Sequence, residues 1–165
     1  MILSELSFPI PSRLVFEETI ARDWYDGITS GFAMSLRHGA AFRFDIVAWG
    51  PKQETRVFVF SPLDGPGLRE IVGLLSRSEA PHWPVWFPKW GMSEPDSSSL
   101  RDEIDRILLK SRPPEFAVAS DSMFETLFAA KPLDQRTRGW LPSQFDGFLS
   151  RDNFDEWKEF LALPT

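Results

Sequence analysis

A chain of 165 residues, of which 42% are hydrophobic and 25% charged, has the composition of a folded protein rather than a disordered one. Its formal net charge of −6 argues against nucleic acid or an anionic membrane as partner, because both attract concentrated Lys and Arg. The absence of cysteine excludes disulfides, thiolate nucleophiles and Cys-based metal sites. We expect a single α+β domain over residues 1–165 without a cofactor.

The first ten residues lack the basic region, the apolar core and the small-residue cleavage site of a secretory signal. No later apolar run approaches the roughly 20 residues that cross a membrane. We therefore expect a cytoplasmic protein.

The clearest pattern lies at about 31–61, where three β-type stretches, 32–36, 41–49 and 56–60, are separated by two turns. Short connections favour antiparallel neighbours, so this region predicts a three-stranded meander. Alternation along the second stretch divides its side chains between two faces. One face is predicted to carry Phe42, Phe44, Ile46 and Ala48, and the other Arg43 and Asp45.

Residues 13–20 and 115–119 are weaker strand candidates that can join either edge, so the predicted antiparallel sheet has three to five strands. A helical period replaces the alternation after Pro62, and the sheet is expected to pack against three to four helices. The predicted helices are 68–75, 99–110, 122–130 and one that begins near Asp152 and turns Phe154, Trp157 and Leu161 inward. Segments 80–98 and 131–151 are predicted to be irregular.

The segment 81–91 contains three prolines that prevent a regular helix and bring several aromatic rings close together. Exposed, such a loop is a stiff contact surface with the residue types of interface hot spots. The plainer interpretation is that the rings cover the sheet. The candidate binding residues here are His82, Trp83, Trp86 and Trp90.

Residues 23–27 hold the only tyrosine, Tyr25, between two carboxylates, and Asp26 with Gly27 is typical of a turn. Tyr25 and Asp26 are candidate binding residues, although a turn with a packed tyrosine is the simpler interpretation. His38 has no carboxylate or histidine at ligand spacing, so no metal site is predicted.

Residues 24–33, Trp-Tyr-Asp-Gly-Ile-Thr-Ser-Gly-Phe-Ala, and the Phe-rich strand that follows resemble uncharacterised small bacterial proteins with a Tyr-Asp-Gly-x-x-Ser-Gly segment. The resemblance covers about residues 24–60. It implies a bacterial source, but no known activity, cofactor or functional residue.

Two functions fit these observations. The favoured one is an interaction module, an acidic protein that binds a protein partner as immunity or antitoxin-like proteins do, with a basic partner favoured by the charge. The absence of phosphate-binding, nucleophile-elbow, zinc-helix and EF-hand fingerprints favours this role over catalysis. The alternative is a small enzyme or small-molecule binder with a site near Tyr25, Asp26 and the 81–91 loop. No catalytic residue is identified for it.

Overall fold

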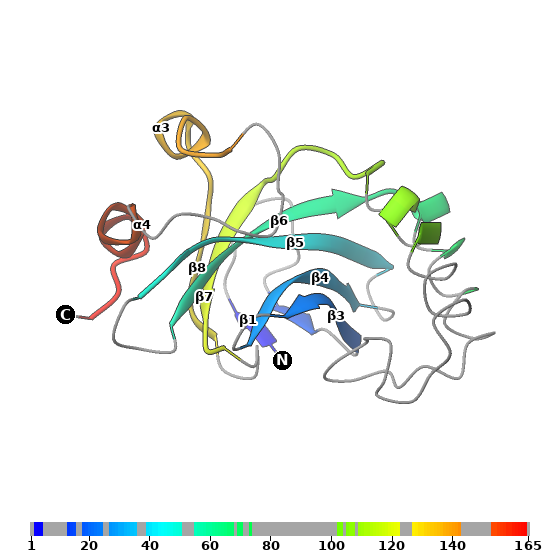
Figure 1. Ribbon diagram of the computed structural model, residues 1–165, viewed down its shortest axis with the longest axis horizontal. Coiled ribbons are helices and arrows are strands. Elements are labelled where there is room, and N and C mark those ends of the chain that lie inside the picture. Colours follow the sequence, from blue (N-terminus) through cyan, green and yellow to red (C-terminus); the bar gives the residue numbers. More distant parts are fainter. Residues whose placement is uncertain are drawn as a thin grey trace.

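The computed structural model describes residues 2–4, 13–15, 18–24, 27–35, 39–50, 55–67, 69–70, 73, 102–103, 105–107, 109–122, 127–142 and 153–164 (Figure 1). Its strands are β1 (Ile2–Ser4), β2 (Arg13–Val15), β3 (Glu18–Trp24), β4 (Ile28–Ser35), β5 (Ala40–Trp49), β6 (Arg56–Leu63), β7 (Phe116–Ser120) and β8 (Leu127–Pro132). The helices with complete bounds are α3 (Gln135–Arg138) and α4 (Phe154–Phe160). Further helical residues lie within 65–73 and 102–107.

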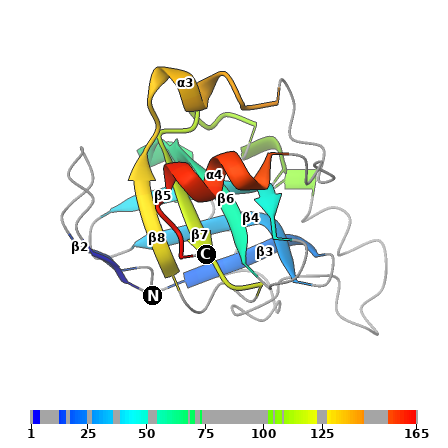
Figure 2. The ribbon, with the colours of Figure 1, turned by 90° about the vertical axis from the view of Figure 1, so that its left-hand side faces the viewer.

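Six strands form one antiparallel sheet in chain order, β3-β4-β5-β6-β7-β8. The predicted meander is therefore confirmed, and it is extended by one strand before β4 and two after β6. The sheet is strongly twisted, since β8 runs upright in Figure 2 while β3 runs almost across it. A separate pair, β1 and β2, places β1 against β8.

The sheet has six strands rather than the predicted three to five because β8 occupies part of the segment predicted as the helix 122–130. Leu and Ala favour helices locally, but β7 offers a row of backbone donors and acceptors that β8 pairs with. Pro132 ends β8, where an edge strand tolerates it. The candidate strand at 13–20 is likewise divided between β2 and β3.

One face of the sheet carries the aromatic core, which consists of Phe42, Phe44, Phe58, Phe60 and Phe116 with smaller apolar neighbours. Cross-strand pairing sets these rings beside one another, because directly opposed residues share a face. The rings of Phe60 and Phe116 stack with centroids 4.9 Å apart, and Phe42 meets Phe116 edge-on at 5.4 Å.

A bulge in β5 changes which face the end of that strand presents. Ile46 pairs with Phe58 and Ala48 pairs with Val57, so Val47 is the extra residue. Phe42, Phe44 and Ile46 lie in the aromatic core as predicted, whereas Ala48 lies with Val47 on the opposite face. The prediction for Ala48 was wrong because strict alternation does not anticipate a bulge.

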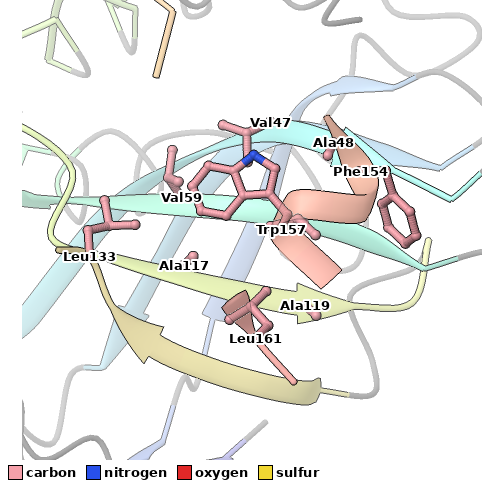
Figure 3. Packing of buried hydrophobic residues seen from close by; sticks show 10 residues of the cluster. Val47, Ala48, Val59, Ala117, Ala119, Leu133, Phe154, Trp157 and Leu161 are labelled. Carbon is pink, nitrogen blue, oxygen red and sulfur yellow. The ribbon is translucent and has the colours of Figure 1, made fainter. Parts of the chain in front are cut away.

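The opposite face is covered by α4, as predicted for the last helix. Phe154, Trp157 and Leu161 lie one turn apart along it and are all buried. Figure 3 shows the indole of Trp157 over the sheet beside Val47 and Val59. Small residues in β7 leave room for the large helix side chains. The covering of this face therefore depends on Trp157, which is completely buried.

Replacing Trp157 by Ala is expected to lower the free energy of unfolding by about 3–5 kcal/mol, because it opens a cavity between α4 and the sheet. Trp157→Phe is expected to cost less, since the indole Nε1 has no hydrogen-bond partner among the described residues and its loss removes an unsatisfied donor. Urea denaturation measures both, with the exposed Glu156→Ala as control, which should change stability by about 0.5 kcal/mol at most. An Ala variant as stable as the control would show that α4 is not docked as described.

Candidate functional site

The candidate binding residues Tyr25, Asp26, His82, Trp83, Trp86 and Trp90 lie outside the described residues, and so does His38. Gly27, which directly follows Asp26, is described and buried. Its surroundings define how the turn between β3 and β4 is attached to the rest of the molecule.

Gly27, Ile28, Arg56 and Ser122 form an arrangement that we name the Gly27 clasp. The backbone N–H of Ile28 donates to the carbonyl of Ser122 at 2.8 Å, and Arg56 Nη1 donates to the carbonyl of Ile28 at 3.0 Å. In the sheet, β5 and β6 separate β4 from β7. The clasp therefore joins β4 to β6, which is not its neighbour in the sheet, and to Ser122, which follows β7.

Gly27 is required by its geometry. Its φ of +133° is a conformation that residues with a side chain rarely adopt. A Cβ added there would lie 2.6 Å from the carbonyl oxygen of Ser122 and 3.0 Å from Cζ of Arg56. The missing side chain lets the backbone of Gly27 approach Arg56 and Ser122 closely.

Arg56 is the charged centre of the clasp and only 6% of its surface is exposed. Its guanidinium also lies over the ring of Trp49, 5.0 Å from the centroid. Burying a guanidinium is costly unless hydrogen bonds and aromatic contacts replace its hydration, and the clasp provides both. The role of Arg56 is therefore structural, because its hydrogen bond fixes the backbone carbonyl of Ile28, two residues after Asp26 in the sequence.

The sequence contained a signal for Arg56 that pattern reading missed. Residues 56–60 alternate, so Arg56 shares a phase with Phe58 and Phe60 and points to the aromatic core. A charge in phase with buried rings predicts a buried cation with a specific partner. The partner, the Ile28 carbonyl, comes from a strand 28 positions away and has no sequence signal.

A second charged group lies on the opposite face of β5, where Arg43 and Asp45 were predicted. Arg43 Nε donates to Asp45 Oδ2 at 2.7 Å, and Nη2 donates to Oδ1 at 3.2 Å. The side chains are 16% and 5% exposed, so the pair is largely shielded from water. A carboxylate held by a guanidinium on both oxygens is suited to structural pairing rather than to proton transfer.

A third group lies at the surface where Trp140, which follows α3, packs against α4, and the two helices lie at the same side of the molecule (Figure 1). The rings of Trp140 and Phe160 lie 6.4 Å apart and both pack edge-on against Trp157. Both are partly exposed, and we name them the Trp140–Phe160 seam. Lys131 Nζ lies 4.4 Å from the Phe160 ring centroid, and Arg136 Cζ lies 5.1 Å from that of Trp140.

The position of α3 in this group was not predicted, because 131–151 was expected to be irregular. A capping box fixes its start: Thr137 N–H donates to Asp134 Oδ1 at 2.8 Å, and Asp134 N–H donates to Thr137 Oγ1 at 2.9 Å. The donation from the Thr137 backbone is the main cause that lowers the pKa of Asp134 below its ordinary value. At the other end of α3, Arg138 Nη1 donates to the Pro114 carbonyl at 2.6 Å.

Among the described residues, no three His, Cys, Asp or Glu side chains gather as metal ligands would. The helices described in the structure are all too short or too polar to cross a membrane. No family model, curated protein or solved structure matches the chain. Function is therefore inferred from the chain's own surfaces.

The clasp predicts that alanine substitution lowers stability by different amounts at two glycines that both have positive φ. Gly39 has φ +60° and open space around it, so Gly39→Ala is expected to cost about 1–2 kcal/mol from backbone strain alone. Gly27→Ala adds a steric clash and is expected to cost about 3 kcal/mol or more. Chemical denaturation of both variants measures the difference, and equal losses would contradict the clasp geometry.

The capping box predicts an acid-sensitive contribution to stability. Because the folded pKa of Asp134 is lowered, this contribution is present above the unfolded pKa of about 3.9 and is lost as the pH falls through the folded pKa. Asp134→Asn keeps a capping side chain without the titration, so its melting temperature should fall less between pH 5 and pH 2 than that of the wild type. Parallel pH profiles for the two proteins would refute this role.

Proposed function

We propose that the protein is an interaction module that binds a basic protein partner through the Trp140–Phe160 seam and the outer face of α4. The observation that carries the proposal is the seam itself. Two partly exposed aromatic rings lie side by side over a fully buried third ring, on a scaffold of sheet and helix. Aromatic side chains held rigidly at a surface are typical anchors of protein interfaces.

The cations Lys131 and Arg136 lie over the rings themselves, so the support for a basic partner comes from the outer face of α4. Asp155, Glu156 and Glu159 are exposed on the outer face of α4, while Lys158 between them is partly buried. The whole chain carries a formal charge of −6, which attracts a cationic protein before contact. Complementary charge raises the rate of association and disfavours acidic competitors, while the apolar seam supplies contact energy.

The proposal predicts a specific pattern in affinity capture from the native host. The wild type is expected to capture a basic protein, and Glu156→Lys/Glu159→Lys should reduce its recovery by about tenfold or more. Trp140→Ala should weaken capture at low and high salt alike, whereas the charge variant should differ most from wild type at low salt.

The matched control is Glu70→Lys/Asp102→Lys, which makes the same charge change at exposed positions. These belong to the helical stretches within 65–73 and 102–107, which lie on the side of the molecule opposite α3 and α4 (Figure 1). The control should capture as the wild type does. A Trp83→Ala/Trp86→Ala/Trp90→Ala variant tests the other aromatic candidate. Loss of capture only there would place binding on the 81–91 loop, and capture unaffected by any variant would refute a role for either surface.

A further inference from the structure

Each ring of the Trp140–Phe160 seam already holds a cation of the protein itself. Lys131 Nζ lies 4.4 Å from the centroid of the Phe160 ring and donates to the Phe160 carbonyl at 3.3 Å. Arg136 Cζ lies 5.1 Å from the centroid of the Trp140 ring. Two cationic side chains, one from β8 and one from α3, are therefore bound at the seam before any partner arrives.

The two rings are held more firmly than the cations over them. Trp140 and Phe160 both pack edge-on against Trp157, which is completely buried. Lys131 and Arg136 are exposed, so water competes with the rings for their charged groups. A cation–π contact at an exposed site is weak, and a long side chain gains rotamer freedom when it leaves the ring. The rings are thus fixed, while the cations over them are exchangeable.

Given the proposed function, on which this step rests, we infer that the two rings are binding sites for cationic side chains of the basic partner, and that Lys131 and Arg136 occupy these sites until the partner displaces them. An arginine or lysine of the partner forms the same kind of contact with a ring that the departing side chain breaks, so the exchange itself costs little. Contact with the exposed anions Glu156 and Glu159 on α4 then adds to the affinity. The internal cations act as competitors that lower the apparent affinity for the partner.

An anion beside the seam favours a replacement cation once Lys131 has left. Asp134, before α3, is exposed, and its pKa is lowered mainly by the Thr137 backbone, with a further contribution from the charge of Lys131. When Lys131 turns away, Asp134 loses part of that compensating charge, and a cation of the partner in the same place restores it. The site near Phe160 therefore favours a positive charge, but not that of Lys131 in particular.

The test is a titration of a fluorescein-labelled oligoarginine peptide, followed by fluorescence anisotropy. Lys131→Ala/Arg136→Ala frees both rings and is expected to bind the peptide about tenfold more tightly than the wild type. The matched control, Arg69→Ala/Arg106→Ala, removes two exposed cations from the helical stretches opposite α3 and α4 (Figure 1). It should bind at most about threefold more tightly, through net charge alone. Lys131→Arg/Arg136→Lys keeps a cation for each ring and should bind as the wild type does.

The same cation removal is then made in a Trp140→Leu/Phe160→Leu background, which completes a double-mutant cycle between the cations and the rings. Without the rings, the removal should tighten binding no more than the control does. Circular dichroism checks that each variant is folded, and if the double leucine background does not fold, Phe160→Leu with Lys131→Ala gives the cycle for one ring.

Three results would overturn the inference: a gain no larger than that of the control, a gain that persists without the rings, or no binding of the peptide to Lys131→Ala/Arg136→Ala. None of them affects the capture experiment, because a basic protein whose capture depends on Glu156 and Glu159 would leave the proposed function intact. A gain that depends on the rings, together with no captured basic protein, would overturn the proposed function alone.

Discussion

The pairing of β5 with β6 is the constraint on which the other features depend. Directly opposed residues share a face, so Phe44 meets Phe60 in the aromatic core, while Asp45 meets Val59 on the opposite face. A slip of one residue would exchange the two sets and turn Arg43 and Asp45 toward the rings. The large rings on one side and the smaller valines and alanines on the other make one face suited to ring packing and the other to a helix.

The bulge at Val47 connects this pairing to the Gly27 clasp. Beyond the extra residue, Trp49 pairs with Arg56, and the indole and guanidinium lie in contact at the end of the aromatic core. Without the bulge, the phase of β5 would turn Trp49 away from Arg56. Because Arg56 reaches the Ile28 carbonyl from that position, a local irregularity in one strand supports a contact between strands that are not neighbours.

Elements with a clear hydrophobic period were predictable from sequence. Elements whose conformation depends on contact with a neighbouring strand or on one or two residues were not. The meander and α4 show clear periods of two and 3.6 residues, and both were predicted. The second strand, Ala40–Trp49, agrees closely with the predicted 41–49, whereas the first begins at Ile28 rather than at residue 32. For β8, residues that favour a helix pair instead with the exposed edge of β7, so tertiary contact overrides propensity. The bulge at Val47 and the turn of α3 each depend on one or two residues, which is too short for a periodic signal.

The candidate sites divide in the same way. The burial of Arg56 was predictable from its place in the alternation of β6. Its hydrogen bond to the Ile28 carbonyl was not, since a backbone carbonyl has no residue type to recognise. The Trp140–Phe160 seam could not be predicted from sequence. Trp140 comes from a segment predicted to be irregular and Phe160 from a predicted helix, and no sequence pattern connects the two. Tyr25, Asp26 and the candidates between 82 and 90 lie outside the described residues, so their binding roles stay predictions.

Charge acts on this surface at two distances. Before contact, at separations up to about the 8 Å screening length of physiological salt, the net charge of −6 repels other copies of the chain and attracts cationic proteins. At contact, the arrangement of α3 and α4 dominates, and the seam is then adjacent to cations as well as anions. A basic protein would therefore be attracted during approach, but at contact it would match only the anions of α4 and would have to avoid or displace the cations Lys131 and Arg136 over the rings.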